Sequence, residues 1–131
     1  MGYTHYWTTT TELPAIAFQA FFADVVKLFA LPEVKGLLAY ESDSTRAPLA
    51  DNDQVQFNGR GEQSHETFIF TRGPQDTFCK TAYKPYDVAV VAVLLLAKRH
   101  FKGLISVWSD GDRDGADWAP GRALAAQIKS K

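Results

Sequence analysis

The chain has 131 residues, of which 46% are hydrophobic and 22% charged, a composition that suits one globular domain and excludes a disordered chain. Its 14 basic and 15 acidic residues leave a net charge of −1, which excludes the basic excess that general nucleic-acid binding needs. One cysteine excludes an internal disulfide bond, and the lack of a signal peptide or of a bilayer-length apolar run predicts a cytoplasmic protein with no membrane partner.

The first third of the chain predicts a strand followed by a helix. Residues 2–10 are rich in aromatic and β-branched side chains, which are typical of a strand, and alternation places Tyr3, His5 and Trp7 on one face. Apolar residues then recur at three- and four-residue spacing across 14–30, which predicts a helix with proline in its first turn. A second proline just beyond this segment is expected to end the helix.

The next segment has weaker patterns. Residues 37–40 fit either a short strand or a buried loop. Residues 41–53 are polar and predict a surface loop, and a loop of this length in a small domain is either functional or mobile. Residues 54–58 alternate polar and apolar side chains, which predicts a half-buried strand that ends at an Asn-Gly turn.

Three further strands and two helices are expected in the second half. A strand over 65–71 ends at a Gly-Pro turn, after which 77–82 is expected to run back beside it. The segment 85–101 begins with proline and is apolar nearly all round, which predicts a largely buried helix. A strand over 104–108 and a short helix over 120–130 complete the chain.

This order of elements favours a single α+β domain over 1–131, with a mainly antiparallel sheet and helices packed on one face. A ferredoxin-like βαββαβ arrangement, or an elaborated variant of it, is the nearest named layout. If 77–82 forms a hairpin with the preceding strand, several strand ends and a helix start meet at one end of the sheet, where Tyr3, His5 and Ser109 also lie. The polar residues gathered there are Asn58, His65, Glu66, Lys80, Lys84, Tyr86, Asp87 and Asp110. Without the hairpin, the lysines lie at the opposite end.

This cluster predicts a binding site for a small anionic or nucleotide-like ligand. A helix N-terminus presents backbone amides and the positive end of the helix dipole, and Lys80 and Lys84 are expected beside it. Asn58, His65 and Asp110 are expected to give polar selectivity. Nothing in the sequence calls for a cofactor or a metal.

Other interpretations of the same residues remain open. Glu66 also suits an ion pair at a strand end, with Lys84 or a helix N-terminus as its partner, and Asp87 also suits a helix cap. A second function hypothesis is a small hydrolase or transferase that uses His65 with Asp110 or Cys79, with His5 as an alternative base for Cys79. No cysteine-enzyme signature surrounds Cys79, and a lone cysteine is more often a small buried hydrophobic residue.

A third hypothesis is a phage or host protein-interaction module. It predicts that Trp7, Trp108 and Trp118 lie together on one exposed patch. Elsewhere in the chain, His100 falls in the last turn of a predicted helix, where it suits a cation that complements the helix dipole.

The acidic segment that begins at Asp110 is similar to the opening of a calcium-binding loop. Asp110, Asp112, Asp114 and Gly115 give the pattern D-x-D-x-D-G. The twelfth position of such a loop is a glutamate, whereas this chain has Gly121, and no helix is predicted directly before the segment. A solvated acidic turn is therefore the favoured interpretation.

Four sequence blocks occur in order along nearly the whole chain: GYTHYW, FNG-x-G followed by HETF, FCKTA-x-KPYDVAV, and SDG. In these blocks the chain resembles a family of small, uncharacterised proteins from bacterial and phage genomes. The resemblance implies a recurring small domain and brings no established activity or catalytic residue with it. The function hypotheses therefore depend on residue chemistry alone.

Overall fold

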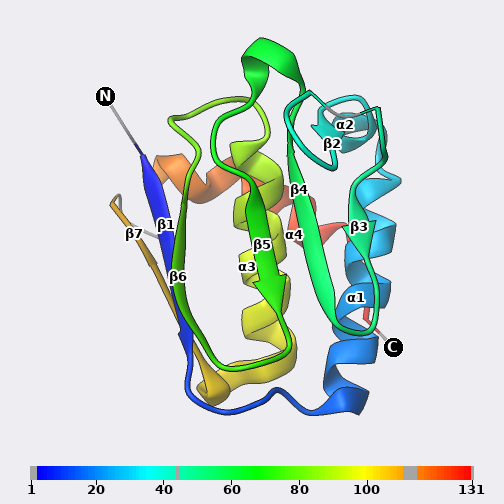
Figure 1. The fold of residues 1–131 in the computed structure, drawn as a ribbon. Helices are drawn as coiled ribbons and strands as arrows, with labels where there is room; N and C mark the ends of the chain where they lie inside the picture. The colour runs from blue at the N-terminus through cyan, green and yellow to red at the C-terminus, as the bar shows by residue number, and fades with distance from the viewer. Residues whose placement is uncertain (1–2, 44, 111–114, 131) are drawn as a thin grey trace.

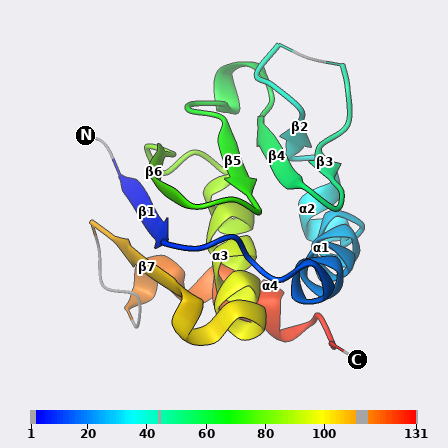
Figure 2. The ribbon, with the colours of Figure 1, turned by 60° about the horizontal axis from the view of Figure 1, so that its bottom comes forward.

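The computed structural model describes residues 3–43, 45–110 and 115–130 and has the predicted α+β architecture. The strands pair antiparallel and form one layer, and the helices lie behind it (Figure 1). A turned view separates the two layers, with the strands above the helices (Figure 2). None of the described helices is both long and apolar enough to cross a membrane.

The strands and helices follow one another in nearly the predicted order. The strands are β1 (Thr4–Thr9), β2 (Leu38–Ala39), β3 (Leu49–Ala50), β4 (Gln54–Gly59), β5 (Phe68–Thr71), β6 (Gln75–Lys80) and β7 (Ile105–Ser109). The helices are α1 (Ala15–Phe29), α2 (Pro32–Lys35), α3 (Asp87–Phe101) and α4 (Ala119–Ala126).

The differences from prediction lie at element boundaries and in one loop. β3 falls inside the segment predicted as a loop, and the strand expected over 65–71 is regular only from Phe68. Pro32 follows the end of α1 as predicted, but it also opens α2, because a proline in the first helical turn lacks only an amide that would be unpaired anyway.

The strands form two neighbouring groups rather than the single sheet of a ferredoxin-like domain. In the first group, β1 lies between β6 and β7. In the second, β4 pairs with β2, β3 and β5. A backbone hydrogen bond of 3.2 Å from the Glu66 amide to the Lys80 carbonyl connects the groups. The layout is an elaborated variant of the expected arrangement.

The chain reverses direction between β5 and β6, as the hairpin prediction requires, but the strands pair differently from a hairpin, since β6 pairs with β1 and β5 pairs with β4. β6 runs antiparallel to β1, and Thr4 lies opposite Lys80. The start of β1, the turn between β4 and β5, the segment after β6, the start of α3 and the end of β7 therefore meet at one end of the strand layer, the upper end in Figure 1. We call this the polar end, and it carries both His65 and Lys84.

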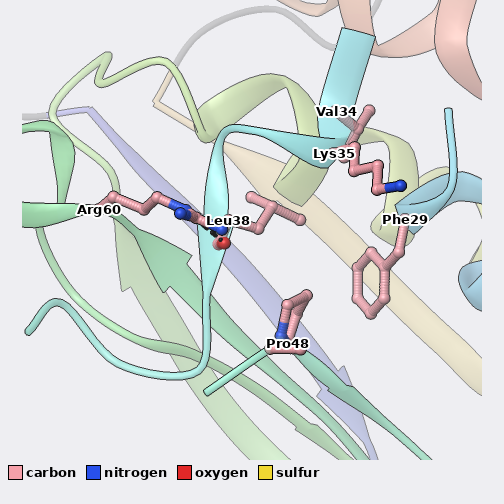
Figure 3. A pocket seen from close by; sticks show the side chains of 7 residues that line it. Phe29, Val34, Lys35, Leu38, Pro48 and Arg60 are labelled. Atoms are coloured by element: carbon pink, nitrogen blue, oxygen red, sulfur yellow. Dashed lines mark hydrogen bonds between the residues drawn. The ribbon is translucent and has the colours of Figure 1, made fainter. Parts of the chain in front are cut away.

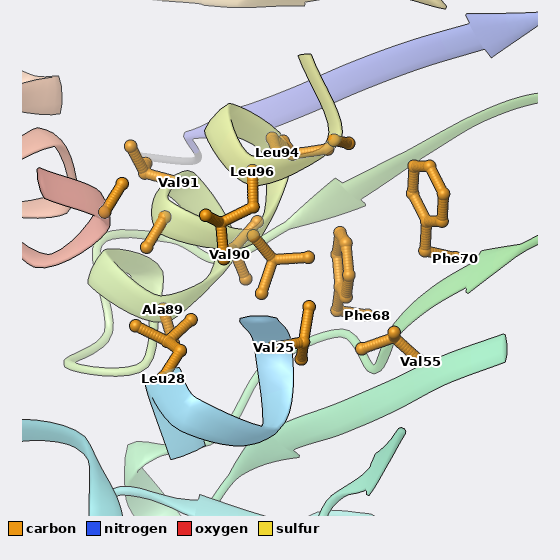
Figure 4. Packing of buried hydrophobic residues seen from close by; sticks show 14 of the residues in the cluster. Val25, Leu28, Val55, Phe68, Phe70, Ala89, Val90, Val91, Leu94 and Leu96 are labelled. Carbon is orange, nitrogen blue, oxygen red and sulfur yellow. The ribbon is translucent and has the colours of Figure 1, made fainter. Parts of the chain in front are cut away.

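The core lies between the strand layer and α3. This helix is apolar on nearly every side and is largely buried, as predicted. Phe68 and Phe70 of β5 and Val25 of α1 pack around it (Figure 4). Each fully buried side chain of this kind contributes about 1.5–3 kcal/mol through removal of apolar surface from water. The core thus holds α3, and with it the polar end, in a fixed position against the strands.

The C-terminal segment is fixed against α3. A Cβ on Gly121 of α4 would lie 2.3 Å from the Val91 Cγ1, so only glycine allows the two helices to approach this closely. The guanidinium of Arg99 donates hydrogen bonds to the carbonyls of Ala125 at 3.0 Å and Ile128 at 2.8 Å. These contacts bring the end of the chain to the C-terminal half of α3.

Candidate functional site

Asn58 closes the turn at the polar end. Its side chain is buried, and its Oδ1 accepts hydrogen bonds from the amides of Gly59 at 2.7 Å and His65 at 3.1 Å. Its Nδ2 donates to the His65 carbonyl at 3.0 Å and to the Thr67 hydroxyl at 3.0 Å. The amide group is therefore fully used in holding the turn, whereas the His65 imidazole is on the exposed side of it.

Glu66 and Tyr86 join the two strand groups. The Glu66 carboxylate accepts a hydrogen bond of 2.7 Å from the Lys80 amide, and the Glu66 carbonyl accepts one of 2.6 Å from the Tyr86 hydroxyl. Burial raises the pKa of Tyr86, so the phenol stays protonated and can donate this bond. The partner of Glu66 is thus a backbone amide rather than the side chain of Lys84.

Two backbone amides at the start of α3 already donate hydrogen bonds within the chain. The Asp87 amide donates to the Lys84 carbonyl at 2.8 Å, and the Ala89 amide donates to the Tyr86 carbonyl at 3.0 Å. The ammonium groups of Lys80 and Lys84 are at the polar end as predicted, and neither has an ion-pair partner among the described residues. The anion site remains a prediction, with the two lysines as its strongest support.

The polar end contains a continuous chain of hydrogen bonds that passes through a buried histidine. The His5 Nδ1 lies 2.5 Å from the Ser109 Oγ, and the His5 Nε2 lies 2.6 Å from the Asp87 Oδ1. The Thr81 hydroxyl donates to the same Asp87 oxygen. His5 is completely buried, while Ser109 is partly exposed. We call Ser109, His5 and Asp87 the relay.

Three different elements bring these residues together. His5 points into the molecule because it alternates with outward-facing residues on β1, and its backbone lies opposite Ser109 of β7. Asp87 is the first residue of α3, and the core fixes that helix behind β1. The relay therefore depends on the tertiary fold and not on any local sequence pattern.

The two hydrogen-bond partners of His5 determine which of its ring nitrogens carries the proton. An ionised carboxylate only accepts hydrogen bonds, so the His5 Nε2 carries a proton and donates a hydrogen bond to Asp87. The Nδ1 is then the unprotonated nitrogen and accepts the hydrogen bond from the Ser109 hydroxyl. A serine that donates to a histidine oriented by a carboxylate is the arrangement that activates a hydroxyl nucleophile.

Two buried donors without acceptors flank the relay. The Tyr3 hydroxyl and the Trp118 Nε1 are buried and have no hydrogen-bond partner among the described residues. Both rings meet the His5 imidazole edge-on, with centroid distances of 4.9 Å for Tyr3 and 5.6 Å for Trp118. Burial raises the pKa of Tyr3, and hydrogen bonding from Trp118 and Ser109 opposes that rise, although neither contact meets the geometry of an ordinary hydrogen bond. Unpaired buried donors are rare in proteins, and such positions are typical of sites that receive a ligand or water.

The backbone beside the relay is strained. Ala82 and Tyr83 have φ angles of 50° and 59°, a left-handed conformation that residues with a Cβ seldom adopt. The Tyr83 ring stacks on the Tyr3 ring with a centroid distance of 4.3 Å. Strained residues of this kind cluster at functional sites, where the surrounding structure holds them in place.

The residues predicted as catalytic partners of His65 have other surroundings. Cys79 is fully buried, and burial raises the pKa of its thiol to about 12, so it carries no reactive thiolate near neutral pH. The Asp110 carboxylate accepts hydrogen bonds of 3.0 Å from the Thr4 amide and 3.0 Å from the Tyr6 hydroxyl. Neither arrangement brings a nucleophile to His65.

The three tryptophans do not form one exposed patch. Trp7 and Trp118 are buried, and only Trp108 is substantially exposed. Trp108 instead stacks beside Tyr6 on the open face of the strand layer, with a centroid distance of 5.6 Å. The exposed patch of three tryptophans that the interaction hypothesis predicted is therefore not formed.

Metal binding finds no support in the described part of the chain. No group of three or more His, Cys, Asp or Glu side chains is placed there to hold an ion. The predicted calcium-like segment lies mainly at 111–114, outside the described residues.

The sequence placed His5 and Ser109 at the polar end but assigned them no joint role. The available signal was the position of His5 on the same strand face as Trp7, since a histidine on a buried face needs hydrogen-bond partners. Thr81 and Trp118 carried no comparable signal. Comparison with known proteins adds nothing to this assignment, because no family model, curated protein or solved structure matches the chain. The resemblance to the bacterial and phage family stays an expectation.

Proposed function

We propose that the protein is a small hydrolase or acyl transferase that acts on an ester or a similar activated acyl group, with Ser109 as its nucleophile. The observation that carries this proposal is the continuous relay from Ser109 through His5 to Asp87, with heavy-atom distances of 2.5 and 2.6 Å. Hydrogen-bond reach between nucleophile, base and orienting carboxylate is the geometric criterion for this chemistry.

In the proposed reaction, His5 takes the hydroxyl proton of Ser109 through Nδ1 as the Oγ bonds to the acyl carbon. The carbonyl electron pair moves onto oxygen, and then returns as the bond to the leaving group breaks. His5 gives its proton to that leaving group, and the acyl group remains on Ser109. A water molecule, or another acceptor, then repeats the sequence and releases the acyl product.

The unpaired donors give the developing negative charge a place to bind. The Tyr3 hydroxyl and the Trp118 Nε1 are buried beside His5, and neither makes a hydrogen bond of ordinary geometry with a described residue. Fixed donors in a site without bulk water stabilise an oxyanion strongly and need no reorganisation. Asp87 does not react in this scheme, because its role is to hold the imidazole and stabilise the imidazolium.

The direct test is covalent labelling with a fluorophosphonate, which reacts with serines that a histidine activates. We expect one adduct per chain, located by mass spectrometry on the peptide that contains Ser109. Hydrolysis of p-nitrophenyl acetate is expected to fall at least roughly 10³-fold in Ser109→Ala, because removal of the nucleophile abolishes the covalent step.

Ser106→Ala is the matched control, because Ser106 lies on the same strand with its side chain on the exposed face. It is expected to leave both labelling and hydrolysis unchanged. A protein that binds no fluorophosphonate at Ser109, while remaining folded by circular dichroism, would rule out the proposed nucleophile.

A second candidate function is the binding of a small anion at the polar end. Its specific support is the position of Lys80 and Lys84, two half-exposed lysines without ion-pair partners among the described residues, on the same end as His65. A thermal-shift screen with nucleotides and phosphorylated metabolites tests it, since a ligand of the native state must raise stability. The supporting result is a stabilising hit whose effect disappears in Lys84→Ala; the absence of any hit rejects the proposal.

A further inference from the structure

A cavity of about 290 Å³ opens beside β2, on the part of the molecule built by the second strand group. The side chains of Phe29, Leu38 and Pro48 surround it, and Lys35 and Arg60 lie at its edge (Figure 3). None of these residues belongs to the relay. The cavity is therefore separate from the chemistry proposed for Ser109.

Local structure explains why an apolar cavity forms here. Phe29 is the last residue of α1, and only two residues separate it from the start of α2, where the chain changes direction. Leu38 of β2 and Val34 of α2 line the cavity and are buried. Pro48 covers one side from the segment before β3. The walls are thus drawn from four separate segments held by the core.

The charge at the edge of the cavity is entirely positive. Lys35 and Arg60 are the charged residues that line it, and the described lining contains no acidic side chain. The Arg60 Nε donates to the Leu38 carbonyl at 2.9 Å, which holds the guanidinium near the opening. An arginine has five donor hydrogens, so this bond leaves four for another acceptor. The Lys35 ammonium has no ion-pair partner among the described residues.

We propose that this cavity binds a small carboxylate with an apolar tail, such as a medium-chain fatty acid. The tail replaces water against Phe29, Leu38 and Pro48, and the carboxylate accepts hydrogen bonds from Lys35 and Arg60 at the edge. A volume near 290 Å³ is at the lower end of ligand-binding pockets, which favours a ligand of fragment size. Paired donation from arginine to a carboxylate gives both affinity and orientation.

The charge pattern distinguishes this occupant from others of the same shape. A neutral alcohol with the same tail gains the apolar contacts but leaves the two cations without an acceptor. An alkyl ammonium ion with that tail places like charges together at the edge. Preference for the carboxylate over both is the signature of the proposed site.

The test titrates the full chain with octanoate, octanol and octylammonium, each followed by calorimetry and by methyl NMR shifts of Val34 and Leu38. We expect octanoate to bind at least roughly tenfold more tightly than octanol, and octylammonium to bind more weakly than either. Equal binding of octanoate and octanol, or no octanoate binding up to about 10 mM, would overturn the proposal.

Three variants locate the binding site. Lys35→Ala and Arg60→Gln are each expected to weaken octanoate binding roughly tenfold while leaving octanol binding unchanged. Ala47→Trp places a large ring at the exposed side of the cavity and is expected to abolish binding of both. Lys129→Ala, which removes an exposed lysine from the C-terminal segment, is the charge-matched control and is expected to bind octanoate normally. Octanoate affinity that survives Ala47→Trp overturns the assignment to this cavity.

Discussion

Two clusters that contain the same three residue types lie near opposite ends of α3, and their hydrogen bonds connect these residues in a different order. At the start of the helix, the relay places His5 between Asp87 and Ser109, so each ring nitrogen has its own partner. Near the end of the helix, Asp24 occupies the centre instead. The Asp24 Oδ2 accepts hydrogen bonds from both the His100 Nε2 at 2.7 Å and the Ser130 Oγ at 2.5 Å.

The second cluster is built to hold chain segments together. The Lys27 Nζ lies 3.5 Å from the Asp24 Oδ1, and the Arg99 Nη1 lies 3.0 Å from the Ser130 Oγ. A buried carboxylate surrounded by donors from α1, α3 and the C-terminal segment ties these segments to one point. We call Asp24, His100 and Ser130 the latch. Its serine donates to a carboxylate whose pKa is lowered, which is a weaker base than an imidazole for removing the hydroxyl proton.

The comparison shows that residue types alone do not specify chemistry. Aspartate, histidine and serine occur in both clusters, but only the relay has a base between the nucleophile and the carboxylate. A groove of about 410 Å³ opens beside the latch, along the outer face of α1, whereas the relay is bordered by unpaired buried donors. The groove thus lies beside the cluster whose hydrogen bonds are less suited to catalysis, so hydrogen-bond connectivity is the better guide to reactivity here.

The largest expected effect comes from neutralising the carboxylate of the relay. Asp87→Asn leaves the shape of the relay intact but removes the acceptor that holds the Nε2 proton, so the Nδ1 no longer presents a lone pair to Ser109. Hydrolysis of p-nitrophenyl acetate is expected to fall about 10³- to 10⁴-fold. Asp24→Asn is the matched control, with the same substitution at the latch, and is expected to keep its rate. Equal losses in the two variants would assign both clusters to structure.

The two histidines are expected to contribute unequally to the free energy of unfolding. His5→Ala removes the main partner of a buried carboxylate and leaves Asp87 with Thr81 alone, which is expected to lower the free energy of unfolding by roughly 3 kcal/mol or more. His100→Ala leaves Asp24 in contact with Ser130 and Lys27, so a loss of roughly 1 kcal/mol is expected. Urea denaturation of both variants measures the difference. A larger loss in His100→Ala contradicts the view that His5 is the better buried and more tightly bonded of the two.

The two clusters also show how far the sequence reaches. Periodicity predicted α1, α3 and most of the strands, because apolar spacing reports directly on which side of an element is buried. Counting the turns placed Asn58, His65 and Lys84 at the polar end. Pairing between distant elements was beyond such patterns, since the contact of His5 with Asp87 joins residues 82 positions apart.

The latch illustrates the same limit from the other direction. His100 was expected to act as a cation at a helix end, and it does lie in the last turn of α3. Its partner Asp24 lies 76 positions earlier and Ser130 lies 30 positions later in the chain, so only the tertiary packing of α1 and the C-terminal segment could reveal the cluster. β3 was missed for a related reason, because two residues that pair with a neighbouring strand leave no periodic signal.

The smallest expected effect is an acid sensitivity that the latch contributes. Burial alone raises the pKa of Asp24, but the hydrogen bonds from Ser130 and His100 and the positive charge nearby outweigh burial, so the pKa is lowered. A carboxyl whose pKa is lower in the folded than in the unfolded protein stabilises the fold fully above its ordinary value of 3.8. That contribution is lost as the pH falls through the lowered folded pKa.

Asp24→Asn, which keeps the shape but cannot ionise, separates this term from general acid denaturation. At neutral pH the variant is expected to be less stable than the wild type by on the order of 1 kcal/mol. The gap between the two is expected to close as the pH falls below the ordinary carboxyl range, because the wild-type Asp24 then becomes neutral as well. Unfolding free energies measured across that range test the sign: a gap that stays constant, or widens in acid, means that the ionised carboxylate is not what holds α1 to the C-terminal segment.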